Sequence, residues 1–319
     1  MSGDICLLNF DGTLQLQNQL KIRSREWIDL SDLQGCHGYC EQHALRQIRK
    51  RLQSRKCRGI TFIGSGHYHY VTYVLMSEIR QPFSLILFDH HTDLSPNDDA
   101  AVLSCGSWLT HALNTLPFLK HAVIIGANPE NRFVAESANS EPAAIESKNL
   151  KSDTIDPKNP KAGPRLYTVK PENSKLDTVE HANRKTCAVE HANPNPGTVE
   201  HANPKTVTLI SESEVKRLPT AALIRKIRSS LPDLPVYISV DKDVLSEKDA
   251  ATNWDQGSMT LDQLLMLIRC LKQHRAVIAA DVCGELPLSP LDHFAAERVR
   301  LAKMNEAANR AIADILTAS

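Results

Sequence analysis

Residues 84–93 of the 319-residue chain read Ser-Leu-Ile-Leu-Phe-Asp-His-His-Thr-Asp. The apolar run at 85–88 predicts a buried strand, and it leads directly into Asp89, His91 and Asp93. Alternate residues of an extended chain lie on one face, so these three side chains would point the same way while the chain stays extended. Two carboxylates and an imidazole at the end of a buried strand are costly unless they bind something, and a divalent metal ion is the obvious ligand. The alternative is an ordinary polar turn after the strand.

Short apolar runs alternate with amphipathic segments over most of the chain, a pattern typical of a parallel sheet that is covered by helices on both faces. We therefore expect an α/β fold with a three-layer, doubly wound, mainly parallel sheet. A turn-rich connection is expected at 27–35. The expected strands are 4–10, 60–63, 84–88, 122–126, 207–210, 236–240 and 276–280. The expected helices are 41–52, a segment after 64–66 that ends at Arg80, 104–116, 219–231, 260–272 and 294–316.

The alternation fails between about 128 and 206, a stretch rich in Pro, Asn, Glu, Ser and Lys. It contains three copies of Val-Glu-His-Ala-Asn with a ten-residue period. The repeated histidines, His181, His191 and His201, suggest metal binding as one interpretation, but a tandem duplication in an exposed insert is favoured. We expect a single domain over 1–319 that carries this low-complexity insert, with one extra strand at 165–169.

The amino-acid composition argues against several classes of function. The chain has 37 basic and 37 acidic side chains, so no basic excess indicates binding to nucleic acid or to an anionic membrane surface. No apolar run approaches the roughly 18 residues that a membrane helix needs. The eight cysteines are scattered, which favours free thiols in a reducing compartment. These features predict a soluble, cytoplasmic protein that binds neither nucleic acid nor a membrane.

A second acidic motif follows the strand at 236–240. Residues 239–243 read Ser-Val-Asp-Lys-Asp, so Asp241 and Asp243 stand at alternate positions at the carboxyl end of an apolar strand. In open α/β sheets, ligands bind outside the carboxyl ends of the strands. Two histidines, His67 and His69, follow the 60–63 strand and are expected at the same edge. The sequence therefore predicts that all these side chains meet at one site.

These motifs resemble those of the arginase–agmatinase (ureohydrolase) family, in the same order along the chain. The family signatures are Gly-Gly-Asp-His after one strand, Asp-x-His-x-Asp after the next, Ser-x-Asp-x-Asp near the C-terminal third and a late Asp-x-x-Glu. They are similar to residues 64–69, 89–93, 239–243 and, with one residue added, 281–285. The resemblance covers roughly 60–126 and 207–315 and implies an arginase/deacetylase-like fold.

The resemblance implies a site for two Mn²⁺ ions per chain. The implied metal ligands are His69, Asp89, His91, Asp93, Asp241 and Asp243, with His67 as the alternative to His69. Asp89 and Asp241 would bridge the two ions. A hydroxide that bridges the ions would then attack the carbon of a linear C–N bond in a guanidino or amidino compound. The family also suggests a homo-oligomer.

Glu285 is implied to pair with the guanidinium or amine of the substrate, with Asp281 as the alternative. The chain also departs from the family pattern. Ser246-Glu247 replaces the usual Asp-Pro after the second acidic motif, and 103–108 replaces the segment that recognises an α-amino acid. Arginine is therefore not the expected substrate by default, and residues 253–255 are predicted to form a specificity loop.

Two other functions remain open at this point. A deacetylase-like hydrolase with a single zinc ion shares the fold family, and His90-His91 resembles its Asp-x-His-His-Gly-Asp motif. The presence of both Asp241 and Asp243 argues against it, because a site for one metal ion needs only one of them. The third hypothesis is a non-catalytic metal-binding protein of the same fold.

Overall fold

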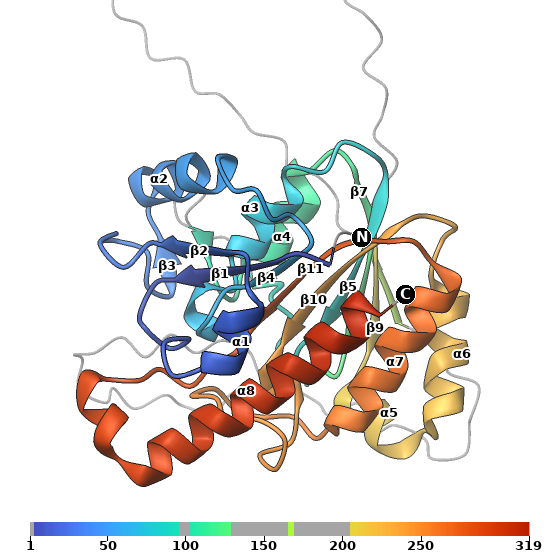
Figure 1. Ribbon diagram of the computed structural model, residues 1–319. Helices are drawn as coiled ribbons and strands as arrows, with labels where there is room; N and C mark the ends of the chain where they lie inside the picture. The colour runs from blue at the N-terminus through green and yellow to red at the C-terminus, as the bar shows by residue number, and fades with distance from the viewer. Residues whose placement is uncertain (1–2, 96–102, 129–164, 169–204, 319) are drawn as a thin grey trace, which may run out of the picture.

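The computed structural model describes residues 3–95, 103–128, 165–168 and 205–318 (Figure 1). The Val-Glu-His-Ala-Asn repeats and most of the predicted insert lie outside these residues. No helix within the described ranges is both long and apolar enough to cross a membrane.

A central sheet of nine strands has the order β2-β1-β4-β11-β10-β5-β7-β9-β8. Its strands are β1 (Ile5–Asn9), β2 (Glu26–Asp29), β4 (Ile60–Phe62), β5 (Phe83–Phe88), β7 (Leu119–Ile125), β8 (Arg165–Thr168), β9 (Thr206–Ile210), β10 (Val236–Asp241) and β11 (Val277–Cys283). Neighbouring strands are parallel except for the β8–β9 pair at the edge. The expected α/β sheet is confirmed.

Helices cover both faces of this sheet (Figure 1). They are α1 (Asn18–Arg23), α2 (Gln42–Gln53), α3 (Val71–Met76), α4 (Trp108–Thr115), α5 (Glu212–Arg217), α6 (Thr220–Ser230), α7 (Leu261–His274) and α8 (Ala296–Thr317). One apolar core joins the sheet to α2, α3 and α4, and a second core joins its other face to α1 and α5 to α8. Two cores on opposite faces make the three layers.

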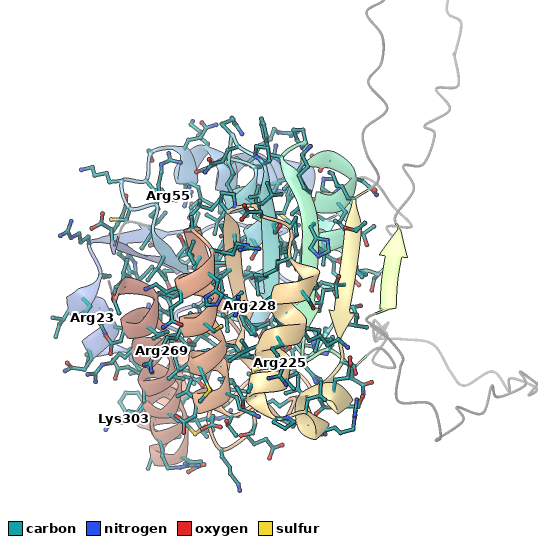
Figure 2. All side chains as sticks on the ribbon, turned by 90° about the vertical axis from the view of Figure 1, so that its right-hand side faces the viewer. Arg23, Arg55, Arg225, Arg228, Arg269 and Lys303 are labelled. Atoms are coloured by element: carbon teal, nitrogen blue, oxygen red, sulfur yellow. The ribbon has the colours of Figure 1, made fainter. Side chains whose placement is uncertain are left out.

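The helices are amphipathic, which explains the period of their sequence pattern. In α7, Leu264, Leu267, Ile268 and Leu271 are buried against the sheet, and a capping box at Thr260 begins the helix. Charged side chains such as Arg269 lie on the opposite face. Figure 2 shows Arg225, Arg228, Arg269 and Lys303 along the solvent-exposed faces of α6, α7 and α8.

Four local expectations were wrong or incomplete. Part of the predicted turn at 27–35 is the edge strand β2, which pairs in parallel with β1 although its residues are only partly buried. The helix expected to reach Arg80 ends at Met76. The helix expected from Ser104 begins at Trp108, because β6 (Leu103–Ser104) pairs with β3 (Tyr39–Cys40). Helix α5, which was not predicted, begins with a capping box at Ser211. The extra strand expected at 165–169 is confirmed as β8.

The order of the strands locates the site. Strands β4, β11, β10 and β5 are adjacent and parallel, so their carboxyl ends meet at one edge of the sheet. The motifs at 64–69, 89–93, 239–243 and 281–285 each lie at or just after the carboxyl end of one of these four strands. The fold therefore brings together side chains that are up to about 200 positions apart in the chain.

Candidate metal centre

The loop after β5 brings Asp89, His91 and Asp93 to the edge of the sheet. Strand β5 ends at Phe88, and Asp93 has a positive φ of 52°. Aspartate is one of the few residues with a side chain that adopt this conformation with some frequency. The chain is therefore not extended through Asp93, although the three side chains do converge as expected. A turn, rather than strand alternation, brings them together.

The first group of possible ligands surrounds His69. Its Nδ1 atom lies 3.0 Å from Asp93 Oδ2, 3.3 Å from Asp89 Oδ2 and 3.5 Å from Asp241 Oδ2. His69 and the three carboxylates are all buried. His69 lies just after the short helix η1 (Gly66–Tyr68), whose N-terminal Ser65 accepts a hydrogen bond from the His67 backbone N–H.

The second group surrounds His91. Its Nδ1 atom lies 2.9 Å from Asp243 Oδ2 and 3.6 Å from Asp89 Oδ1. The two oxygens of Asp89 therefore face different histidines, Oδ2 toward His69 and Oδ1 toward His91. Asp89 Oδ2 is buried and accepts no hydrogen bond from the residues that the structure describes. This geometry is what two adjacent cations that share one carboxylate require.

Backbone N–H groups hold the carboxylates in place. Asp241 Oδ1 accepts a hydrogen bond from the backbone N–H of Asp243 at 3.0 Å, within the short helix η2 (Lys242–Val244). Asp243 Oδ1 accepts from the backbone N–H of His90 at 3.0 Å, and Asp89 Oδ1 accepts from that of His91 at 2.6 Å. The β5 loop thus holds Asp243 of the β10 loop, and each loop also holds one of its own carboxylates.

The electrostatics of the site favour a cation. Burial, together with the charges of Asp243 and Asp89, raises the pKa of Asp241 to about 7. Burial also lowers the pKa of His91, but hydrogen bonds to Asp243 and Asp89 outweigh it and raise that pKa to about 12. A divalent cation would relieve the repulsion between these carboxylates. The recess that they line has a free volume of about 10 Å³, which is the size of one water molecule or ion.

Comparison with known proteins gives a consistent result. The model of the Arginase family matches residues 171–306. Over this part of its sequence the chain is similar to the Arginase family. An uncharacterized protein from Thermotoga maritima is 24% identical over 281 residues, which are 88% of this chain and 79% of that protein.

Three solved structures illustrate the similarity in fold. A hypothetical agmatinase from Burkholderia thailandensis is 16% identical with a TM-score of 0.52, covering 98% of this chain and 86% of that one. The formimidoylglutamase from Bacillus subtilis subsp. subtilis is 12% identical with a TM-score of 0.54, covering 98% and 86%. The arginase from Bacillus cereus is 13% identical with a TM-score of 0.53, covering 99% and 98%. These structures therefore show that the chain shares their fold.

A layer of polar side chains lies behind the candidate ligands and orients them. His69 Nε2 lies 3.1 Å from Ser239 Oγ, which donates to Asp281 Oδ1 at 2.8 Å. Tyr237 Oη donates to the other oxygen of Asp281 at 2.6 Å. Asp281 is thus held behind His69 and does not line the recess. Of these side chains, Ser239 belongs to a motif visible in the sequence, whereas nothing in the sequence pointed to Tyr237.

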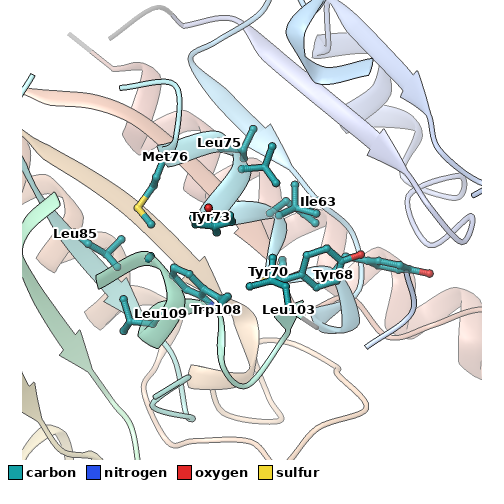
Figure 3. Close-up of a cluster of buried hydrophobic side chains, with 14 of the residues drawn as sticks. Ile63, Tyr68, Tyr70, Tyr73, Leu75, Met76, Leu85, Leu103, Trp108 and Leu109 are labelled. Carbon is teal, nitrogen blue, oxygen red and sulfur yellow. The ribbon is translucent and has the colours of Figure 1, made fainter. Parts of the chain in front are cut away.

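Trp108 is a second residue that sequence reasoning missed. Its Nε1–H donates a hydrogen bond to Asp93 Oδ2. Trp108 begins α4 and is fully buried in the core that joins α3, α4 and β5, where Figure 3 shows it beside Leu109. The segment at 103–108, which departs from the family pattern, therefore supplies a hydrogen bond that orients the candidate ligand Asp93.

Glu285 lies outside the ligand groups and does not line the recess. Its carboxylate is buried and forms an ion pair with Lys242, which is itself fully buried between Asp241 and Asp243. The same carboxylate accepts hydrogen bonds from Asn309 Nδ2 at 2.6 Å and from Gln17 Nε2 at 2.9 Å. Both of its oxygens are therefore occupied by side chains of this chain.

Trp254, Gly66 and Cys105 complete the lining of the recess. Trp254 packs against His67 with ring centroids 5.1 Å apart and against His91 at 6.1 Å. His67 Nε2 lies 2.9 Å from Asn253 Nδ2. The structure thus places His67 at the rim and His69 among the carboxylates. Asn253 and Trp254 belong to the predicted specificity loop, whereas Asp255 is exposed to solvent.

A larger cavity of about 440 Å³ lies at the amino-terminal ends of the strands, lined in part by Arg55, Arg58 and Tyr237. It contains none of the residues of the two ligand groups. Its larger volume therefore does not identify this cavity as the active site.

Proposed function

We propose that this protein hydrolyses a linear C–N bond in a small guanidino or amidino compound with the help of two bound divalent cations, Mn²⁺ in the first instance. The observation that carries the proposal is the carboxylate of Asp89, whose two oxygens face two separate histidine-centred groups. Such a shared carboxylate is the expected core of a site for two metal ions.

The chain offers a ligand set to each cation. One cation would be held by His69, Asp89, Asp93 and Asp241, and the other by Asp89, His91, Asp241 and Asp243. A ligand set dominated by carboxylate oxygens suits Mn²⁺ better than softer metals. Bound there, the cation pair would lower the pKa of a shared water and supply hydroxide at neutral pH.

We assign recognition of the substrate to Trp254, because no carboxylate of the recess is left for it. The carboxylates that line the recess all belong to the ligand groups, and Glu285 is already paired with Lys242. A planar cationic group is also recognised by the face of a tryptophan ring. We therefore assign the guanidinium or amidinium contact to Trp254, and the predicted substrate contact of Glu285 becomes the weaker alternative.

The decisive experiment combines metal analysis with a substrate panel. Purified protein is loaded with Mn²⁺, its bound metal is counted, and release of urea or ammonia is measured for a series of guanidino and amidino compounds. Two Mn²⁺ ions per chain and turnover of at least one compound support the proposal. One bound zinc ion would favour the deacetylase-like alternative. Two bound ions with no turnover across the panel would favour a non-catalytic metal-binding protein.

A further inference from the structure

A third group of ligand atoms adjoins the two described above, and it contains sulfur. Cys283 Sγ lies 3.1 Å from Asp241 Oδ2, the same oxygen that lies 3.5 Å from His69 Nδ1. The ligand atoms of His69, Asp241 and Cys283 all lie within 4.8 Å of one another, and all three side chains are buried. Nothing in the sequence motifs assigns a role to this cysteine.

The end of β11 holds Cys283 firmly in this position. Cys283 pairs with Asp241 in the parallel register of β10 and β11. The following residue, Gly284, has a φ of +83°, and a Cβ atom there would lie 2.2 Å from Asp241 Oδ1. Glycine therefore lets the strand end closely approach the β10 ligand loop.

Alternate residues of β11 act on the same histidine. Asp281 and Cys283 share one face of the strand. Asp281 accepts a hydrogen bond from Ser239, which contacts His69 Nε2, whereas Cys283 lies beside Asp241 at the Nδ1 side of the ring. The thiol thus lies next to the carboxylate oxygen of Asp241 that faces His69 Nδ1.

We propose that Cys283 is a thiolate ligand to the cation held by His69 and Asp241. The inference rests on the metal site of the proposed function and deepens it. A thiol that coordinates a cation is deprotonated, and its proton is released to solvent. Because thiolate is a soft ligand, it shifts the preference of this position from Mn²⁺ toward Zn²⁺, Co²⁺ or Fe²⁺.

Cys105 provides a matched control. It lines the recess and is buried, but it belongs to none of the three ligand groups. Replacing either cysteine with serine removes one buried sulfur atom near the ligand groups at nearly constant volume. Only the change at Cys283 removes a ligand atom.

The test uses the whole chain loaded with Co²⁺, followed by absorption spectroscopy and metal counting. The wild-type protein and Cys105→Ser should show a near-ultraviolet charge-transfer band from sulfur to cobalt. Cys283→Ser should bind Co²⁺ without that band, and its preference for Zn²⁺ over Mn²⁺ should fall at least tenfold. A band that survives unchanged in Cys283→Ser would overturn the proposal.

A measurement on wild-type protein keeps the proposal testable if Cys283→Ser does not fold. X-ray absorption of the Zn²⁺-loaded protein should reveal one Zn–S distance of about 2.3 Å beside Zn–N and Zn–O distances of about 2.0–2.2 Å. Bound metal with no sulfur neighbour would overturn the role of Cys283 and leave the proposed function standing. Failure to bind any metal would overturn both.

Discussion

Two neighbouring clusters of buried side chains, one around Glu285 and the other around the four candidate ligand carboxylates, differ in how their negative charge is compensated. Glu285 is neutralised by the chain itself, through Lys242, Asn309 and Gln17. Among the described residues, the ion-pair partners given for Asp89, Asp93, Asp241 and Asp243 are His69 and His91, and no lysine or arginine pairs with them. Buried charges are tolerated when they are paired, so the first cluster is complete and the second calls for a cation. The difference distinguishes Glu285, a structural carboxylate, from the four carboxylates of the candidate ligand set.

Removing a ligand should have the largest effect. Asp243→Ala should lose one of the two cations and lower turnover by more than about 1,000-fold, because a metal ion contributes several kcal/mol of transition-state stabilisation. Metal counting and steady-state kinetics measure both effects. Asp255→Ala, in the exposed part of the 253–255 loop, is the control and should keep both cations. Unchanged metal content in Asp243→Ala would remove Asp243 from the ligand set.

Removing the countercharge of Glu285 should destabilise the protein without changing a candidate metal ligand. Lys242→Met leaves Glu285 buried and unpaired, which should cost about 3–5 kcal/mol of unfolding free energy. Chemical denaturation measures this loss. The exposed pair Arg300–Glu297 is the control, and Arg300→Met should leave the denaturation midpoint unchanged.

A second variant sharpens the same comparison. Lys242→Met combined with Glu285→Gln removes both charges, and it should recover most of the lost stability because no unpaired charge remains. If the double variant is as unstable as Lys242→Met, the loss comes from packing around Lys242 rather than from its charge.

Removal of metal should affect only the uncompensated cluster. A cation present at 100 times its dissociation constant stabilises the folded state by about 2.7 kcal/mol. Chelation should therefore lower the melting temperature of the wild-type protein. The same chelator should have a much smaller effect on Asp243→Ala, and an identical shift in both proteins would show that the metal binds elsewhere.

The smallest effect is expected for side chains that support a ligand without binding the cation themselves. Asp281→Asn keeps the shape of a side chain that positions His69 through Ser239 but weakens that support. Metal affinity should fall by roughly 10–100-fold, as is typical when a partner of a ligating histidine is changed. Titration with Mn²⁺ measures it. Tyr237→Phe, which removes one hydrogen bond to Asp281, should give a smaller loss of the same kind.

The sequence located the fold and the ligand motifs because both depend on short-range patterns. Apolar runs that end in Asp89 or Asp241 mark the carboxyl ends of buried strands, and the family resemblance paired them. The supporting residues escaped notice for a physical reason. Trp108 and Tyr237 are large, buried side chains of ordinary core type, and only their polar atoms, aimed at Asp93 and Asp281, reveal a further role.

The amino-acid sequence by itself determined the α/β alternation, the order of the motifs and the types of ligand available to a cation. Tertiary structure alone decided which atoms meet. It placed His69 rather than His67 among the carboxylates, turned the two oxygens of Asp89 toward different histidines and brought Cys283 beside Asp241. It also paired Glu285 with Lys242. A pattern along the chain specifies the face and the strand end of a residue, whereas the pairing of buried charges depends on which strands lie side by side.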